Sequence, residues 1–253
     1  IFIIMYQVIR PYSVEDKRFT SVTKELLYKC LTLYKAENLI RVGKSNDGGY
    51  IISDIGKYDI LLSGGIGGDI SFEKAFTEKY NTKCVAFDGE NIKDSSNVCK
   101  NEKNILYVAK NIGDINNDKF KNLKDYLNRF NNIFVKMDIE GGEFPFLYSL
   151  TMNELKNIKQ MTFEFHFVDI IDKWKILEKI SETHYLIHFH ANNNNRVVYR
   201  YDNIWVPGVF ECTYIRKTDL KNIILNDKPL PLDIDNQNTN SIDYMINCPP
   251  WVN

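Results

Sequence analysis

From about residue 57 onward, short apolar runs alternate with stretches whose apolar residues recur at helical spacing. The apolar runs predict strands over 59–63, 83–88, 104–109, 132–138, 160–166, 185–191 and 209–216. The stretches between them predict helices over 70–80, 118–130, 142–157 and 172–183. This alternation predicts an α/β fold with a Rossmann-like, doubly wound sheet and helices on both faces.

Three further patterns complete the predicted fold. Strands 185–191 and 209–216 have no helical pattern between them, so we expect an antiparallel hairpin with a long asparagine-rich loop. Residues 14–36 predict a helix, for which Ser13 is the expected N-cap. The segment 39–52 has Asn-Asp-Gly-Gly between two β-prone runs, which predicts a second hairpin.

These patterns divide the chain into three parts. We expect an N-terminal helix and hairpin cap over 1–56, the Rossmann-like core over 57–216, and an irregular tail over 217–253, where prolines stand among polar residues. The apolar stretch 1–9 is too short to span a membrane and reads as a strand.

Composition limits the classes of partner. The chain has 253 residues and a net charge of −1, so no global field attracts nucleic acid or an anionic membrane. The five cysteines are scattered and never form Cys-x-x-Cys, which argues against disulfides or a zinc module. We therefore expect a cytoplasmic protein without a membrane partner. We interpret the run Asn192–Asn195 as compositional bias, and a homo-oligomer is compatible with the sequence.

A glycine-rich turn, residues 63–69, joins the first strand of the core to a helix. Its glycines allow a sharp turn and the close approach of a ligand, and the helix start directs free N–H groups toward it. Asp88 ends the next strand about twenty residues later, where a carboxylate accepts hydrogen bonds from a ribose diol. The turn alone is a weak signal, because glycine-rich turns also serve packing, but the combination favours a nucleoside-type cofactor.

Charged residues also follow the later strands. Asp138 ends an otherwise apolar strand, which points to function, whereas Glu143 is explained by a solvated helix start. Glu164 and His166 lie on the same face of a strand interior. Burying such polar groups costs free energy unless they are hydrogen-bonded or in contact with water. His190 ends the following strand. Convergence of these groups makes His166 a candidate functional residue, with a satisfied structural histidine as the alternative.

Together these segments resemble the FkbM-like class I methyltransferases, and within them the eukaryotic and viral methyltransferase-like group. The similarity runs from about residue 39 to 216. It is carried by Arg41-Val-Gly43, Asp47-Gly-Gly-Tyr50, residues 64–73, Phe87-Asp88, residues 135–143, residues 163–166, His190-Ala-Asn-Asn and Glu211-Cys-Thr-Tyr214.

The resemblance implies a seven-stranded sheet that binds S-adenosylmethionine and transfers its methyl group to an oxygen. It places the main chain around Gly64, Gly65 and Gly67 near the amino-acid part of the cofactor, Asp88 at the ribose and Asn111-Ile112 near the adenine. It also implies that Asp138 faces the methionine end and the acceptor. Ser63 stands where class I enzymes usually carry an acidic residue, and Asp69 is the candidate replacement.

A hydroxyl acceptor must lose its proton during the transfer. We predict His166 as the leading general base, with Asp138 and Glu164 orienting it or the acceptor and His190 as the second candidate. Alternatively, Asp138, Glu164 and His166 bind a divalent metal that acidifies the hydroxyl. The resemblance favours a sugar hydroxyl of a glycan or glycoconjugate, or another small-molecule acceptor.

Three other functions remain open from the sequence. RNA ribose 2′-O-methylation would need a Lys-Asp-Lys-Glu tetrad, to which Lys136, Asp138 and Glu164 could contribute, but the neutral charge makes nucleic acid an unfavoured partner. A nicotinamide-dependent oxidoreductase expects a third motif glycine where Ile70 stands. The third is a catalytically silent cofactor-binding module.

Overall fold

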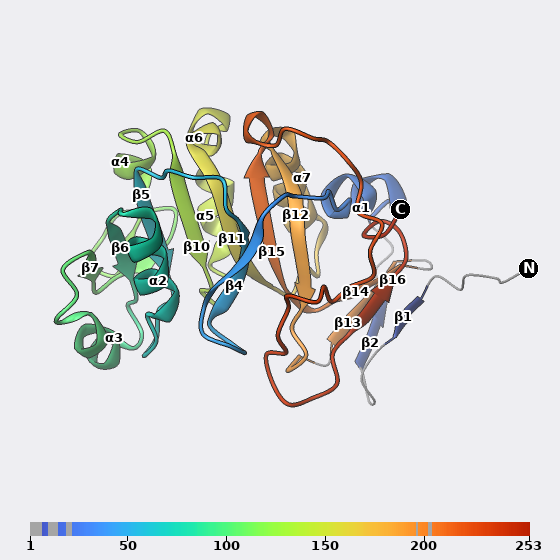
Figure 1. The fold of residues 1–253 in the computed structure, drawn as a ribbon, viewed down its shortest axis with the longest axis horizontal. Helices are drawn as coiled ribbons and strands as arrows, with labels where there is room; N and C mark the ends of the chain where they lie inside the picture. Colours follow the sequence, from blue (N-terminus) through green and yellow to red (C-terminus); the bar gives the residue numbers. More distant parts are fainter. Residues whose placement is uncertain (1–6, 10–14, 19–21, 196, 202–203) are drawn as a thin grey trace, which may run out of the picture.

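A seven-stranded sheet forms the centre of the molecule (Figure 1). The computed structural model describes residues 7–9, 15–18, 22–195, 197–201 and 204–253. In order across the sheet, the strands are β12 (His184–Ala191), β15 (Val209–Arg216), β11 (Ile158–His166), β10 (Ile133–Met137), β5 (Ile60–Gly64), β6 (Cys84–Phe87) and β7 (Ile105–Val108).

The order of the strands in the sheet indicates where a ligand would bind. From β5 the chain builds outward to β6 and β7 on one side and to β10 and β11 on the other, and these five strands are parallel. The reversal between β5 and β10 is the point at which open α/β sheets bind ligands. The Rossmann-like sheet is therefore confirmed. The antiparallel pairing of the last two strands is also confirmed, and β15 lies inside, between β11 and β12.

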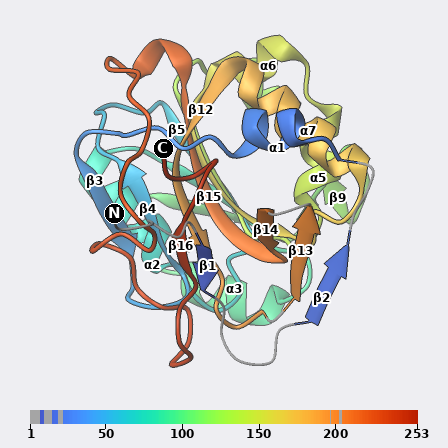
Figure 2. The ribbon, with the colours of Figure 1, turned by 90° about the vertical axis from the view of Figure 1, so that its right-hand side faces the viewer.

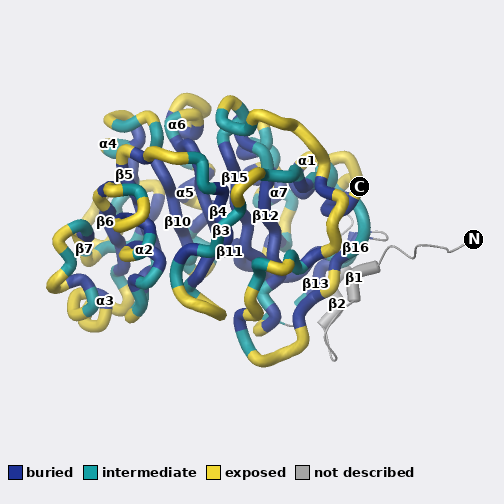
Figure 3. Tube along the Cα trace, viewed as in Figure 1, coloured by how far each residue is buried: buried dark blue, intermediate teal, exposed yellow. Residues whose placement is uncertain are grey.

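Helices cover both faces of the sheet, as expected. Alternate residues of β5 show why: Ile60 and Leu62 pack into one apolar cluster, and Leu61 packs into the other. The central strands are accordingly buried in Figure 3, and α1 lies beside α7 in Figure 2. The first cluster contains α1 (Lys24–Leu31), α4 (Lys124–Leu127), α5 (Glu143–Ser149), α6 (Met152–Asn157) and α7 (Ile171–Thr183); the second contains α2 (Ser71–Tyr80) and α3 (Ile92–Cys99).

Several helices differ from their predicted extents. The helix expected over 142–157 is two helices, because Thr151 and Glu154 form a capping box that starts α6. The helix expected over 118–130 is reduced to α4, and Phe120–Lys121 instead forms β9, which pairs with β8 (Asn111–Ile112). The sequence did not predict α3. The N-terminal helix is shorter than expected: Thr23 caps α1, and Ser13 lies outside the described residues.

The predicted hairpin of β3 (Leu39–Gly43) and β4 (Gly49–Ser53) is confirmed. It lies across the polar face of β11 and β15, where Thr213 Oγ1 donates a hydrogen bond to the Ile51 carbonyl at 2.6 Å. The backbone N–H of Ser53 likewise donates to Gln160 Oε1 at 2.7 Å. The hairpin therefore satisfies polar groups of the central sheet.

Residues between β12 and β15 form more than a loop. They contain β13 (Val197–Tyr201) and β14 (Ile204–Pro207), which join β2 (Glu15–Arg18) in a three-stranded sheet. After β15 the chain is mostly irregular, apart from the 3-10 turn η1 (Lys217–Asp219) and β16 (Met245–Asn247), which pairs with β1 (Gln7–Ile9). The three-part domain division remains a prediction. Among the described residues, no helix combines the length and apolar character of a membrane span.

Candidate functional site

A cavity of about 450 Å³ opens at the carboxyl ends of β5, β6 and β10. We call it the glycine-turn cavity. It is lined by six residues that we expected near the cofactor from the sequence: Gly65, Gly67, Asp88, Asn111, Ile112 and Asp138. Apolar walls come from Ile112, Phe120 and Ile139. The topological switch point therefore carries a pocket with both polar and apolar surface.

Asp88 shapes this cavity by holding its main chain. Its Oδ2 accepts from the N–H of Gly67 at 2.8 Å, and its Oδ1 accepts from the N–H groups of Glu90 and Asn91. A carboxylate offers about four acceptor positions, so one remains for a ligand hydroxyl. Asn111 supports the same wall by accepting from the N–H of Gly89 and donating to Glu90.

Two glycines allow the turn to lie against the end of β10. Gly65 has a φ of +72°, and a Cβ there would lie 1.7 Å from the Asp138 carbonyl oxygen. Gly67 has a φ of +50°, and a Cβ there would meet nothing within 4 Å. The first glycine is required by packing, whereas the second faces open space at the cavity.

Three other predicted cofactor residues do not line the glycine-turn cavity. Ser63 is fully buried and donates to Glu73 Oε1 at 2.5 Å. Gly64 is closely packed, because an added Cβ would meet Ile112 at 2.6 Å. Asp69 accepts from Ser71 at the start of α2 and pairs with Lys44 at 3.1 Å. The contacts of these three residues are therefore with the protein around the turn, and none of the three lines the cavity.

A second cavity, of about 280 Å³, lies at the ends of β10 and β11. We call it the strand-end cavity. It brings together Asp138, Glu164 and His166, as the sequence predicted, and adds Asp47 from the β3–β4 turn and Glu140. Asp138 and Glu140 line both cavities. The two cavities therefore meet at these two carboxylates.

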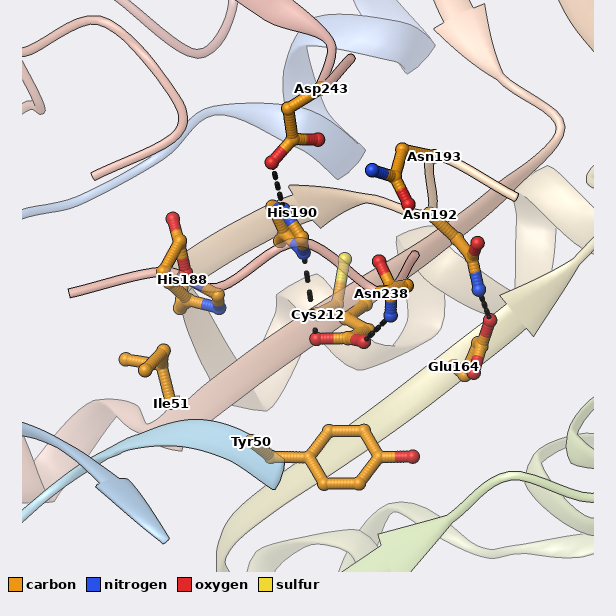
Figure 4. A network of polar contacts seen from close by, with 12 residues as sticks. Tyr50, Ile51, Glu164, His188, His190, Asn192, Asn193, Cys212, Asn238 and Asp243 are labelled. Carbon is orange, nitrogen blue, oxygen red and sulfur yellow. Dashed lines mark hydrogen bonds and ion pairs between the residues drawn. The ribbon is translucent and has the colours of Figure 1, made fainter. Parts of the chain in front are cut away.

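Asp138 and Glu164 are each held by a neighbour. The Tyr50 hydroxyl donates to Asp138 Oδ2 at 3.3 Å. Asn192 Nδ2 donates to Glu164 Oε1 at 2.5 Å, and Figure 4 shows this second contact. Burial, followed by the charges of Asp138 and Glu211, raises the pKa of Glu164 to about 9. The acidic surroundings therefore favour the protonated, uncharged form of Glu164.

His166 is 9% exposed and lies between carboxylates. Its Nε2 is 3.3 Å from Glu140 Oε2 and 4.0 Å from Asp138 Oδ1, and its Nδ1 is 3.4 Å from Glu143 Oε1. Burial opposes a charge on the ring, but the acidic neighbours prevail and raise the pKa of His166 to about 9. The acidic neighbours therefore favour the protonated form of the His166 ring.

His190 does not line either cavity. It is buried beneath the C-terminal segment, with Nε2 3.0 Å from Asp243 Oδ2 and Nδ1 3.8 Å from Glu211 Oε2 (Figure 4). Burial disfavours its charge, but Asp243 and Glu211 raise the pKa of His190 to about 10. The structure therefore separates His190 from His166, and in this arrangement His190 ties the C-terminal segment to β12.

Lys136 is not among the residues that line the strand-end cavity. Its Nζ donates to the Gly65 carbonyl at 2.9 Å, so it connects β10 to the glycine turn. This position does not supply the lysine that a 2′-O-methylation tetrad would place beside the acceptor.

Sequence reasoning missed several residues of the strand-end cavity. Asn192, Asn194 and Asn195 line it, although we had interpreted the asparagine run as compositional bias. Their place directly after β12, at the same sheet edge as the other candidates, was a usable signal. Phe167 lines the rim with a φ of +51°, which is unusual for a bulky residue. The β3–β4 turn brings in Asp47 through long-range contacts that no local pattern encodes.

No protein-family model matches the sequence, and no curated protein sequence matches it. Membership of the FkbM-like family therefore remains a prediction.

Solved structures that the chain resembles include an rRNA methylase from Streptococcus thermophilus, at 13% identity and a TM-score of 0.37, over 64% of this chain and 89% of that chain. Another is Methanococcus jannaschii fibrillarin, a pre-rRNA processing protein. It is 11% identical, with a TM-score of 0.40, over 66% of this chain and 70% of that chain. A third is a putative tRNA (m1A22) methyltransferase from Streptococcus pneumoniae, solved with S-adenosyl-L-methionine. It is 9% identical, with a TM-score of 0.38, over 64% of this chain and 68% of that chain. At such low identities and TM-scores, nothing about the chemistry of this chain follows from them.

Proposed function

We propose that this chain is an S-adenosylmethionine-dependent O-methyltransferase that acts on a sugar hydroxyl of a glycan or glycoconjugate. The observation that carries the proposal is the junction of the two cavities at Asp138 and Glu140. A donor in one cavity and an acceptor in the other would meet there, which is the alignment that an in-line methyl transfer needs.

The glycine-turn cavity fits the donor. Gly67 leaves room for the methionine part, the remaining acceptor position of Asp88 suits a ribose hydroxyl, and Ile112 and Phe120 offer apolar surface for the adenine. When bound, S-adenosylmethionine supplies an activated methyl group on a positively charged sulfur. Asp138 and Glu140 place negative charge where that sulfur would lie.

The strand-end cavity fits a polyhydroxylated acceptor. Its amide side chains offer both donors and acceptors, and its carboxylates accept from hydroxyl groups. Phe167, 37% exposed, provides an apolar surface at the rim for a sugar ring. The same carboxylates would repel the phosphates of RNA, which favours a neutral acceptor over a polyanion.

The hydroxyl proton would pass into the group formed by Asp138, Glu164 and His166. Asp138 has the better position to receive it, because it lines both cavities and because the acidic groups around His166 favour the protonated form of that ring. His166 then acts by orienting Asp138 and balancing its charge. The sequence predicted His166 as the base and Asp138 as the orienting residue, and this proposal exchanges the two roles.

Replacing Asp138 with Asn tests the proposal. We expect methyl transfer to a glycan acceptor to fall at least about 100-fold, the range of general-base catalysis, while S-adenosylhomocysteine binds with nearly unchanged affinity. Asp169→Asn is the matched control, because Asp169 pairs with Lys173 outside both cavities. Unchanged turnover in Asp138→Asn, or methylation of RNA but of no glycan, would contradict the proposal.

A further inference from the structure

We propose that Asp138, Glu140 and His166 bind one divalent cation, Mg²⁺ or Mn²⁺, at the junction of the two cavities. One oxygen from each carboxylate and one ring nitrogen of His166 lie within 4.8 Å of one another. Atoms this close can turn toward a single ion by small side-chain rotations. Carboxylate oxygens with one imidazole are a ligand set that suits Mn²⁺ and, with water completing the shell, Mg²⁺.

The orientation of His166 also suits a ligand role. The ring is 9% exposed, yet its Nδ1 has no hydrogen-bond partner among the described residues. Nδ1 faces Glu143, while Nε2 faces Glu140 and Asp138 at the cavity. Metal-binding histidines commonly point one nitrogen at the metal and the other at a carboxylate, which fixes the tautomer.

Glu143 is the carboxylate behind His166, and we assign it as a positioning residue. It is fully buried in the first turn of α5, and its Oε1 accepts from the N–H of Ile139 at 2.9 Å. Its Oε2 has no hydrogen-bond partner among the described residues. A buried carboxylate with a free oxygen is costly, and turning it toward a protonated Nδ1 would reduce that cost.

The surroundings favour a cation at this point. Asp47 and Glu164 form a second group with Asp138, so four carboxylates surround one small cavity. Among the described residues that line it there is no lysine or arginine. The side chain of Glu140 is 84% exposed, which gives an ion a path from solvent. A divalent ion would offset the mutual repulsion of these groups.

The role of the ion rests on the proposed function, although its binding does not. Beside the acceptor, the cation would hold hydroxyl oxygens against the donor cavity and make the hydroxyl more acidic. This assistance matters because a carboxylate such as Asp138 is by itself a weak base for a sugar hydroxyl.

Titration of the full-length chain with Mn²⁺, followed by electron paramagnetic resonance and calorimetry, tests the site. We expect one ion per chain in the wild type and at least tenfold weaker binding in Glu140→Gln. Because the Glu140 side chain is exposed, we expect this variant to fold like the wild type. Asp169→Asn, which removes a carboxylate outside the cavity, should bind like the wild type. No binding at millimolar Mn²⁺, or equal affinity in Glu140→Gln and wild type, would overturn the proposal.

Glu143→Gln tests the positioning role. Loss of an outer carboxylate behind a ligating histidine typically weakens metal binding by about 10–100-fold. Melting temperatures measured without metal separate this effect from a general loss of stability. Wild-type affinity for Mn²⁺ in a folded Glu143→Gln would overturn this assignment. Binding of S-adenosylhomocysteine, measured without metal, distinguishes failure of the cation site from failure of the proposed function.

Discussion

At the scale of single residues, buried polar side chains contact and orient the side chains that line the cavities. Glu143 illustrates this. In the sequence, a solvated helix start explained it, but the side chain is fully buried and faces His166. A carboxylate in the first helical turn is stabilised by the helix dipole whether it faces water or protein, so sequence position alone could not separate the two.

Tyr50 has a comparable role toward Asp138. Tyr50→Phe removes the hydroxyl that donates to Asp138 Oδ2 at 3.3 Å. We expect kcat for methyl transfer to fall about tenfold, equivalent to about 1.4 kcal/mol, with the affinity for S-adenosylhomocysteine kept. Tyr80→Phe is the control, because that hydroxyl donates to Asp54 at 3.0 Å, remote from both cavities. Equal kcat values in the two variants would contradict this role.

At the scale of elements, the glycine turn and the strand ends create the site. The predicted strands agree closely with those of the central sheet, because buried parallel strands leave an apolar signature in the sequence. The helices were less predictable. The break between α5 and α6 was visible as Thr151-Met-Asn-Glu154, a capping-box pattern. In contrast, α3 has only three apolar residues, Ile92, Val98 and Cys99, and α4 occupies only four residues of the predicted stretch 118–130.

The glycine turn offers a matched pair of variants. Gly65→Ala and Gly67→Ala both place a side chain at positive φ, which costs about 1–2 kcal/mol each. Gly65→Ala also forces a Cβ against the Asp138 carbonyl, so we expect a further loss of about 3 kcal/mol or failure to fold. Urea unfolding measures both. Equal losses would show that the turn does not pack against β10 as described.

At the scale of the whole molecule, distant segments complete the polar face of the sheet. The C-terminal segment reaches β12 through Asp235 and Asp243, which pair with His188 and His190. These contacts span 47 and 53 residues of sequence, respectively, so no local pattern could indicate that His190 would pair there. Asp138, Glu164 and His166 were predictable together because parallel strands end at one edge.

This attachment makes stability depend on pH. The pKa of His190, about 10 in the fold, is raised above its unfolded value of about 6.5. The groups that face it are Asp243 and Glu211, with Asp235 and His188 nearby. Its contribution is therefore complete below about pH 6.5 and is lost as the pH rises toward 10.

The measurement is the free energy of unfolding between pH 6.5 and 10. It should fall more steeply in the wild type than in His190→Gln, by at most about 1.4 kcal/mol per pH unit. Parallel curves for the two proteins would mean that His190 is not held as a cation by the C-terminal segment.

The proposed function requires that the glycine-turn cavity bind S-adenosylmethionine. Isothermal titration calorimetry of the wild-type chain with S-adenosylhomocysteine, and separately with NAD⁺, tests it most directly. We expect saturable binding of one S-adenosylhomocysteine per chain and no heat of binding with NAD⁺. Binding of NAD⁺, or of neither compound, would contradict it.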